Sequence, residues 1–326
     1  MARNTKAIFF LSLLDLCILI VLLASFYTKE GNKIITELNK KIYPETFILP
    51  QRSKPILFPN GKTPIITAKS AYVIDTDNNN VLLNYHGDTK MPMASITKIM
   101  TALIAIEQTN NDILVPVKQD AIDEVKQNNG SNAQLVVGDK IPMEEMLYAL
   151  LLPSGDDAAI AIADAISGNV TDFTGKMNEY AKKLRLFHTH FINPDGLTYY
   201  LPSGKANLEE YTTAADLVHL TEYAMHYEKF RQIVALQEFK LPLSSLHGSY
   251  TWKNTDSLLS TYSGAEGIKT GYTAEAGYCL VFSALRQGHH IIGVVLNEDS
   301  PEARFTDATR LLDWSFSQPQ HLAILR

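Results

Sequence analysis

The chain carries three short motifs whose order and spacing constrain its fold more than any other feature of the sequence. They are Ser95-Ile96-Thr97-Lys98, Ser154-Gly155-Asp156 and Lys269-Thr270-Gly271. In the first motif a hydroxyl and an amine lie three residues apart, so on a helix the two side chains share one face. A serine hydroxyl needs a base to take its proton before it attacks efficiently. A lysine serves as that base only where its surroundings favour the free amine, and the fold must supply those surroundings.

Each motif has its own predicted context. Ser95 directly precedes an apolar pattern of helical period, which indicates the start of a helix. Ser154 falls between the apolar runs 146–152 and 158–165, which indicates a loop between two helices. Lys269 precedes a β-favouring run and is expected on or beside a strand. Each motif alone also fits a helix cap or a turn, but the three contexts together are those that serine acyl-transfer chemistry needs.

Residues 66–316 resemble the penicillin-binding D-alanyl-D-alanine carboxypeptidases, which are serine peptidases of bacterial cell-wall metabolism. The segments that carry the resemblance are 93–101, 151–159, 191–197, 213–217 and 264–279. The resemblance implies that Ser95 attacks the carbonyl of a terminal D-Ala-D-Ala bond and forms an acyl-enzyme. It also implies that Lys98 accepts the Ser95 proton and that Ser154 relays a proton toward the leaving amine.

The same resemblance assigns substrate binding to the remaining motif residues, which are Asp156, Lys269, Thr270, Gly271 and Tyr272. Lys269 and Thr270 would hold the terminal carboxylate of the substrate. The backbone N–H groups of Ser95 and Tyr272 would form the oxyanion hole, where two donors meet developing negative charge. The implied reaction needs no metal and no cofactor.

Three positions depart from the family pattern. Asp156 stands where the family usually has Asn, and an ionised Asp accepts hydrogen bonds but cannot donate one. A carboxylate near Lys98 would also favour the ammonium over the free base. Asp156 is therefore expected to be protonated, to pair with Lys269, or to slow the reaction. The other departures are Asp195, where the family loop often has His, and His289-His290, where some relatives carry an Arg near the carboxylate pocket.

Charge and cysteine content exclude other classes of function. The net charge of −6 leaves no basic stripe for nucleic acid, so none is expected as a partner. Cys17 lies in an N-terminal apolar segment and Cys279 in a predicted strand, so we expect no disulfide between them. His188 and His190 have the spacing of a metal pair, but no third ligand is evident, and no metal is predicted.

The N-terminus carries an apolar stretch, residues 7–27, behind the basic residues Arg3 and Lys6. Its length matches the hydrocarbon core of a bilayer, and we expect it to insert despite Asp15. We interpret it as an uncleaved transmembrane signal-anchor rather than a signal peptide, because no small-residue pair marks a cleavage site. The prediction is a single-pass cell-membrane protein, with residues 1–6 in the cytoplasm and the catalytic domain on the extracytoplasmic side, periplasmic or cell-wall.

The rest of the chain divides into a Pro- and Lys-rich tether, residues 28–66, and a catalytic domain, residues 67–320. Residues 95–235 are mostly helical in pattern, and Pro301 opens a final amphipathic helix. Strand patterns lie at 71–75, 81–85, 278–284 and 291–296. Strands at both ends with helices between them predict an α+β fold, in which one antiparallel sheet packs against a helical lobe and the active site lies between them. The resemblance implies the penicillin-binding, β-lactamase-like transpeptidase fold.

The resulting prediction is a serine-type D-Ala-D-Ala carboxypeptidase that removes the terminal D-Ala from peptidoglycan stem peptides, in cell-wall biogenesis and cell shape. β-Lactam antibiotics are expected as covalent inhibitors, and the membrane as a partner through the N-terminal helix. Two alternatives stay open: a D,D-endopeptidase that cuts cross-links, and a catalytically weak wall-binding protein, which Asp156 would explain. A β-lactamase is disfavoured because no Glu stands in a matching position to deacylate the enzyme.

Overall fold

The structure, a computed structural model, describes residues 63–109 and 113–318. All of these residues belong to one compact unit. The predicted cytoplasmic segment 1–6, the predicted membrane anchor 7–27 and all but the last four residues of the predicted tether lie outside the described residues.

The predicted localisation as a single-pass membrane protein is corrected. Within residues 63–109 and 113–318, no helix is both long enough and apolar enough to cross a bilayer. The segment 7–27, on which the prediction rested, lies outside these residues. The prediction drew on the apolar length of that segment, which is a property of composition and does not by itself make a spanning helix.

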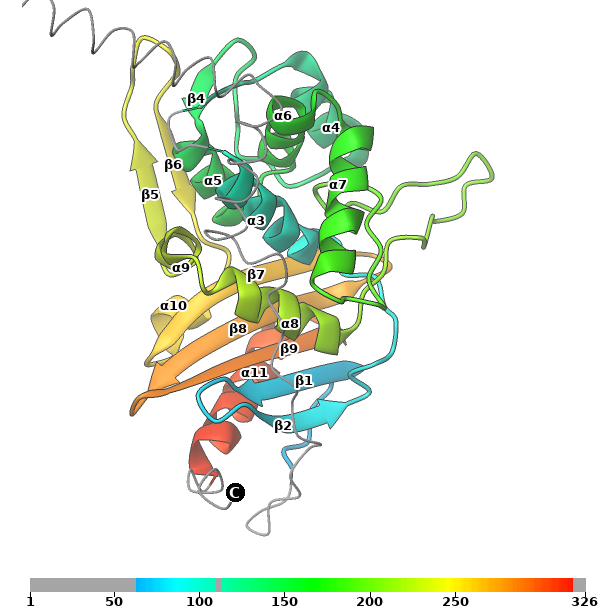
Figure 1. Cartoon of the computed structure of the whole chain (residues 1–326), viewed down its shortest axis with the longest axis vertical. Helices are drawn as coiled ribbons and strands as arrows, with labels where there is room; N and C mark the ends of the chain where they lie inside the picture. The colour runs from blue at the N-terminus through cyan, green and yellow to red at the C-terminus, as the bar shows by residue number, and fades with distance from the viewer. Residues whose placement is uncertain (1–62, 110–112, 319–326) are drawn as a thin grey trace, which may run out of the picture. The chain divides into compact units, whose positions relative to one another are not determined.

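The centre of the fold is a five-stranded antiparallel sheet with strand order β2-β1-β9-β8-β7 (Figure 1). Its strands are β1 (Ser70–Asp75), β2 (Asn80–Tyr85), β7 (Ala265–Thr273), β8 (Gly277–Arg286) and β9 (His289–Glu298). β1 pairs with β9 along its whole length, beginning with Ser70 opposite Leu296. The sheet therefore joins the two ends of the described chain and leaves β7 at one edge.

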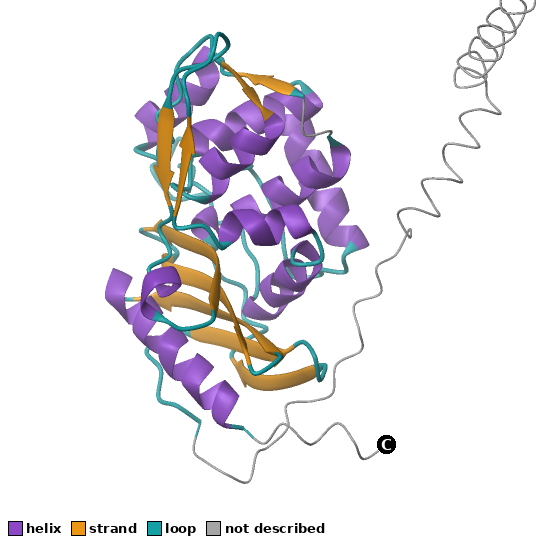
Figure 2. Ribbon diagram, turned by 90° about the vertical axis from the view of Figure 1, so that its left-hand side faces the viewer, coloured by secondary structure: helices purple, strands orange, loops and turns teal. Residues whose placement is uncertain are grey.

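The two faces of the sheet pack against different helices, because neighbouring residues on a strand point to opposite sides. In β8, Val281 joins the core of the helical lobe, whereas Phe282 joins a smaller cluster beneath α11 (Pro301–Ser317). α11 begins where Ser300 Oγ accepts the N–H of Ala303 at 3.1 Å, a standard helix cap. Figure 2 shows α11 on one face of the sheet and the helical lobe on the other.

The helical lobe is built around α3 (Lys98–Gln108), whose residues 98–105 are all buried. A helix that is buried on every side belongs in a core, and α3 packs against most of the helices around it. The other helices are α4 (Gln119–Asn128), α5 (Met143–Leu151), α6 (Asp156–Ser167), α7 (Val170–Lys183), α8 (Ala214–Ala224), α9 (Glu228–Val234) and, beside β7, α10 (Leu258–Thr261). The predicted α+β fold, with terminal strands packed against a helical lobe, is confirmed.

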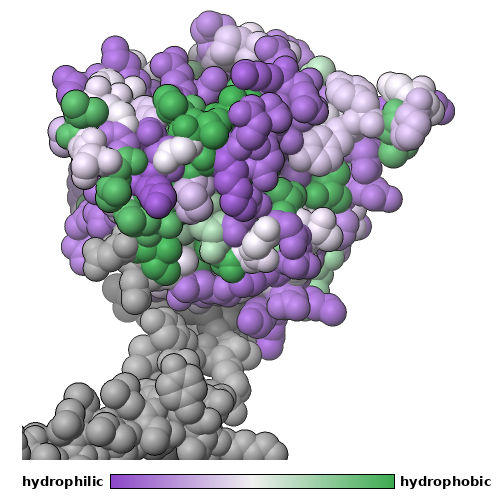
Figure 3. All heavy atoms as spheres, turned by 90° about the horizontal axis from the view of Figure 1, so that it is seen from above, coloured by the Kyte–Doolittle hydropathy of each residue, from purple (hydrophilic) through white to green (hydrophobic). Residues whose placement is uncertain are grey.

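Two small antiparallel sheets were not predicted. β3 (Leu114–Pro116) pairs with β4 (Lys140–Pro142), and β5 (Glu238–Leu241) pairs with β6 (Tyr250–Lys253). Strands this short give no alternating pattern that can be recognised in a sequence. The β5–β6 hairpin extends toward the end of the lobe that lies away from the sheet (Figure 1), and Figure 3 shows apolar side chains scattered among polar ones on that end.

Candidate active site

Ser95 and Lys98 lie in a turn that enters α3. Ser95 belongs to the 3-10 turn Ala94–Thr97, and Lys98 is the first residue of α3, so the predicted helix start is confirmed. Lys98 Nζ donates a hydrogen bond to Ser95 Oγ at 2.8 Å. Ala94 has a φ of 50°, a left-handed conformation that costs energy for any residue other than Gly. The turn is thus a strained one, and it holds the hydroxyl of Ser95 against the amine.

Gly196 makes room for this turn. A Cβ at Gly196 would lie 2.0 Å from the Ala94 carbonyl oxygen, and the φ of +86° also favours glycine. Asn193 fixes the same loop, because its Oδ1 accepts the N–H of Gly196 at 2.6 Å and its Nδ2 donates to the Leu197 carbonyl at 2.8 Å. The loop at 191–197 therefore packs against the turn 94–97, here called the nucleophile turn, and supports it.

Lys98 is completely buried and has an acceptor for each of its three N–H bonds. Its Nζ donates to Asp156 Oδ1 at 2.5 Å, to the Asp195 carbonyl at 2.7 Å and to Ser95 Oγ at 2.8 Å. The contact with Asp156 is an ion pair between two side chains that have no exposed surface. Asp156 thus pairs with a lysine, as one of the predicted alternatives held, but the lysine is Lys98 and not Lys269.

Ser154 and Asp156 lie where α5 ends and α6 begins, so the predicted loop between helices is confirmed. Ser154 has a φ of 66°, and its buried Oγ has no hydrogen-bond partner among the residues that the structure describes. A buried hydroxyl without a partner is available to a substrate. Asp156 is the first residue of α6, and the N-terminal end of the helix dipole favours its negative charge. Burial raises the pKa of the Asp156 carboxyl, and the ammonium of Lys98 opposes that shift.

The third motif lies on the edge strand β7, which packs against the nucleophile turn. A Cβ on Gly271 would lie 3.0 Å from the Met93 carbonyl oxygen, so glycine lets the strand and the turn approach closely. Lys269 is buried, and its Nζ donates to the Thr270 carbonyl at 2.9 Å. Burial lowers the pKa of Lys269 well below its ordinary value, and the charge of Lys98 acts in the same direction.

Thr270 and Tyr272 have different surroundings. Thr270 Oγ1 lies 2.6 Å from Thr255 Oγ1, a second hydroxyl that the sequence did not single out. Tyr272 is 54% exposed, and its ring stacks on Tyr278 with the ring centroids 4.3 Å apart. Because β7 is an edge strand of the sheet, backbone groups on its outer side are open to pairing with an extended substrate.

Arg304 is a functional candidate that sequence reasoning missed. It lies on α11, and its Nη1 donates to the Gly271 carbonyl at 3.2 Å. The doublet His289-His290, which was aligned with an Arg that some relatives carry near the carboxylate pocket, lies away from the Lys-Thr-Gly motif. Gly271 pairs with Cys279 at one end of the sheet, whereas the histidines begin β9 beside the β8–β9 turn at the other end. In the sequence, Arg304 is one cation in an amphipathic helix. Its place beside the site depends on how that helix packs against the sheet.

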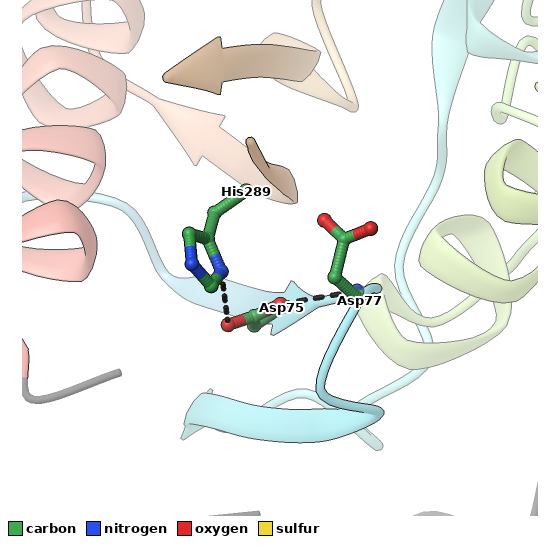
Figure 4. Close-up of side chains that lie close together, drawn as sticks. All are labelled: Asp75, Asp77 and His289. Atoms are coloured by element: carbon green, nitrogen blue, oxygen red, sulfur yellow. Dashed lines mark hydrogen bonds and ion pairs between the residues drawn. The ribbon is translucent and has the colours of Figure 1, made fainter. Parts of the chain in front are cut away.

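Within the described part of the chain, one group of side chains has the spacing of metal ligands, namely Asp75, Asp77 and His289 (Figure 4). Its carboxylates are already engaged. Asp75 Oδ1 accepts the N–H of Asp77 at 3.1 Å, and Asp77 Oδ2 accepts the N–H of His290 at 2.6 Å. Figure 4 shows the Asp77 carboxylate turned away from Asp75. We interpret these three residues as a structural contact that links the β1–β2 turn to β9.

A buried Ser–Lys pair at a helix start, with a Lys-Thr-Gly edge strand packed beside it, defines a serine-type acyl-transfer enzyme of the α+β class. The chain belongs to the D-alanyl-D-alanine carboxypeptidase family, whose sequence pattern matches residues 59–300. The prediction of a serine D-Ala-D-Ala carboxypeptidase is thereby confirmed.

Individual relatives agree with this assignment. The D-alanyl-D-alanine carboxypeptidase of Streptomyces sp. (strain K15) is 39% identical over 78% of this chain and 89% of its own length. The carboxypeptidase DacF of Bacillus subtilis is 35% identical over 77% of this chain and 62% of its own length. A D-alanyl-D-alanine endopeptidase of Pseudomonas aeruginosa is 30% identical over 76% of this chain and 77% of its own length.

Solved structures confirm the predicted penicillin-binding fold. The crystal structure of the Streptomyces K15 DD-transpeptidase superposes with a TM-score of 0.72 at 38% identity, covering 78% of this chain and 99% of that chain. Penicillin binding protein 6B from Escherichia coli superposes with a TM-score of 0.70 at 29% identity and covers 82% of each chain.

Proposed function

We propose that this protein removes the terminal D-Ala from peptidoglycan stem peptides through an acyl-enzyme on Ser95, with residues 67–320 as its catalytic domain. The observation that carries the proposal is the 2.8 Å contact between Lys98 Nζ and Ser95 Oγ, buried beside the edge strand β7. β-Lactams act on the same hydroxyl as covalent inhibitors. The activity belongs to cell-wall biogenesis and the maintenance of cell shape.

Acylation begins when Ser95 Oγ attacks the carbonyl carbon of the D-Ala-D-Ala bond. Lys98, as the free amine, takes the hydroxyl proton, and the carbonyl π electrons move onto the oxygen. The backbone N–H groups of Ser95 and Tyr272 stabilise that oxyanion. The oxyanion electrons then reform the carbonyl as the C–N bond breaks. Ser154, with its buried unpartnered hydroxyl, gives its proton to the leaving amine and regains one from the Lys98 ammonium, which returns Lys98 to the free amine. Water then hydrolyses the ester on Ser95 and releases the shortened peptide.

The carboxylate of the terminal D-Ala is proposed to bind at β7. Lys269 and Thr270 lie on the strand, and Arg304 reaches it from α11 through the Gly271 carbonyl. Two basic side chains that converge on one strand suit an anionic group. Because burial lowers the pKa of Lys269, the arrival of a carboxylate would favour its charged form and strengthen the contact.

Covalent trapping tests this proposal. The full-length chain incubated with benzylpenicillin should gain the mass of one penicilloyl group, and Ser95→Ala should gain none. Peptide mapping should place the adduct on Ser95. An adduct of the same mass that persists in Ser95→Ala would assign the nucleophile to another residue.

A D,D-endopeptidase is the second candidate, and the observation that favours it is the 30% identity to the Pseudomonas aeruginosa endopeptidase. A weak wall-binding protein is the third, because Asp156 is paired with Lys98 and, as a carboxylate, cannot donate a hydrogen bond to a substrate. Digestion of purified muropeptides separates the three. Free D-Ala indicates the carboxypeptidase, loss of cross-linked dimers indicates the endopeptidase, and binding without cleavage indicates the wall-binding protein.

A further inference from the structure

Three buried carboxyl groups lie around Lys98, more than a single cation can neutralise. Asp156 and Asp195 have no exposed surface, and Glu210 is 7% exposed. In each of the three, one oxygen has no hydrogen-bond partner among the residues that the structure describes: Asp156 Oδ2, Asp195 Oδ2 and Glu210 Oε2. A buried carboxylate without a partner is costly, so the group as a whole must retain protons.

The contacts of the three carboxyls show which one carries the charge. Asp156 forms an ion pair with Lys98 at 2.5 Å and begins α6, where the helix dipole favours an anion. Asp195 Oδ1 accepts only a backbone N–H, from Leu197 at 2.8 Å, and Glu210 Oε1 accepts the Thr97 hydroxyl at 2.7 Å. Neither Asp195 nor Glu210 has a cation at ion-pair distance within the described chain.

Electrostatics points the same way. Burial raises the pKa of Asp195 well above its ordinary value, and the charge of Asp156 raises it further. Burial likewise raises the pKa of Glu210 well above its ordinary value, and Asp195 acts in the same direction. Burial also raises the pKa of Asp156, but the ammonium of Lys98 opposes that shift. The shifts and contacts together therefore favour the un-ionised forms of Asp195 and Glu210, and the ion pair leaves Asp156 as the carboxylate of the group.

The remaining surroundings of Asp156 supply little positive charge. The titratable groups that face it are Lys98 on α3, Glu124 on α4, Asp157 on α6, Asp195 in the loop before Gly196, and Lys269 on β7. Three of these five are acids, and burial disfavours the charged form of Lys269. Lys98 is thus the main counter-charge of Asp156.

These contacts determine how the amine of Lys98 is oriented after it loses a proton. As a free amine, Lys98 keeps two N–H donors, and Asp156 Oδ1 and the Asp195 carbonyl accept them. Both of those oxygens are acceptors, so the nitrogen lone pair is left to face Ser95 Oγ, the one neighbour of the three that can donate. When the Ser95 proton moves to Nζ, the new ammonium forms against the Asp156 carboxylate.

We propose that the base of this enzyme is a Lys98–Asp156 pair flanked by two neutral acids, Asp195 and Glu210, in which Asp156 is a positioning residue that orients the amine and stabilises the ammonium formed from it. The inference rests on the proposed acyl-enzyme chemistry at Ser95. An ionised Asp156, 2.5 Å from Lys98 Nζ, stabilises the ammonium that forms there, and a neutral amide at the same position would do so less. Asp156→Asn should therefore change how the rate of acylation depends on pH.

The test is the rate of acylation by a chromogenic cephalosporin, measured from acidic to strongly alkaline pH for the full-length chain and for Asp156→Asn. The rising limb of the profile should move to lower pH in the variant by about one unit, which is a tenfold change in rate at a given pH on that limb. The plateau should fall, because a weaker base transfers the proton less readily. The two profiles should cross, with the variant as fast or faster near neutral pH and slower at high pH.

Asp164→Asn is the matched control. Asp164 lies on the same helix and pairs with Lys118, away from Lys98, so its replacement should leave the profile of the wild type in place. An unshifted limb in Asp156→Asn would overturn the inference. So would a loss of about tenfold or more at every pH, about 1.4 kcal/mol of transition-state stabilisation. Absence of acylation in the wild type at all pH values would instead refute the proposed function.

A second measurement addresses the neutral acids without relying on the stability of Asp156→Asn. The infrared spectrum of the full-length chain at neutral pH should contain the carbonyl band of un-ionised carboxyl groups. Part of that band should disappear in Asp195→Asn and part in Glu210→Gln. If neither variant changes the band, both groups are ionised and the proposed charge distribution is wrong.

Discussion

At the scale of single residues, the decisive feature is a lysine with no exposed atom. A buried ammonium gives up its hydration, and only full hydrogen bonding compensates for that loss. Lys98 has three acceptors, which are a carboxylate, a carbonyl and the nucleophile itself. Because two of the three cannot donate a hydrogen bond back, the same contacts that permit burial also aim the lone pair. The contacts that allow Lys98 to be buried are therefore the same contacts that orient its amine toward Ser95.

Lys98→Ala should slow acylation by benzylpenicillin by roughly 10²- to 10⁴-fold, the usual contribution of a positioned base. The substitution removes the group that lies 2.8 Å from Ser95 Oγ. Time-resolved intact-mass spectrometry measures the rate, and circular dichroism checks that the variant is folded. Acylation at the wild-type rate in a folded Lys98→Ala protein would show that another group activates Ser95.

The sequence predicted which residues take part in the chemistry better than it predicted which of them contact one another. Ser95 and Lys98 were recognisable because they lie only three residues apart in the sequence. The pairing of Lys98 with Asp156 joins positions 58 residues apart, and it depends on how α6 packs against α3. Arg304 was missed for the same reason, because a contact between α11 and β7 has no local pattern.

At the scale of elements, the site is assembled by close approaches of backbone. Gly196 allows its loop to touch the Ala94 carbonyl, and Gly271 allows β7 to touch Met93. A Cβ at Gly196 would push apart the elements that meet there, whereas a Cβ at Gly271 would make a tight contact with the Met93 carbonyl oxygen. The terminal hairpin, the long helices and the central strands were predictable from periodicity, but these approaches were not, because they depend on tertiary packing.

Gly196→Ala should slow acylation by roughly 100-fold, the order of effect that a displacement of about 1 Å has on a reacting group. The new Cβ would lie 2.0 Å from the Ala94 carbonyl oxygen, so the turn that carries Ser95 must move. Gly204→Ala is the control, since Gly204 also has a positive φ, +76°, but no heavy atom within 4 Å of the new Cβ. Equal acylation rates in the two variants would show that the close approach does not position Ser95.

At the scale of the whole described domain, a cluster of hydrogen-bonded polar groups connects the segment before β1 with the end of β9 and with α11. The hydroxyl of Thr67, just before β1, donates to Glu298 Oε2 at 2.7 Å at the end of β9. The backbone N–H of Thr67 donates to Asp307 Oδ2 on α11 at 2.5 Å. Burial raises the pKa of Glu298 to about 7, and the neighbouring Asp307 contributes to the shift. The cluster is therefore sensitive to pH near neutrality.

Glu298→Gln should change how the stability of the fold depends on pH. Glu298 ionises at about 4.3 in an unfolded chain and at about 7 in the fold, so the folded state binds the proton more tightly. The stabilisation is complete below about pH 4, declines as pH rises, and is gone above about pH 7. Thermal melting across this range should show wild type losing stability relative to Glu298→Gln as pH increases. Parallel curves would mean that Glu298 is not the titrating group.

The pairing of β1 with β9 also determines when, during synthesis of the chain, the central sheet can be completed. A ribosome that has just completed β8 has already made Ser95, Lys98 and the Lys-Thr-Gly strand, yet β1 still lacks the neighbour that links it to the rest of the sheet. Contacts between segments so distant in the chain form slowly and late. We therefore expect the sheet, and the site beside it, to be completed only after β9 has been made.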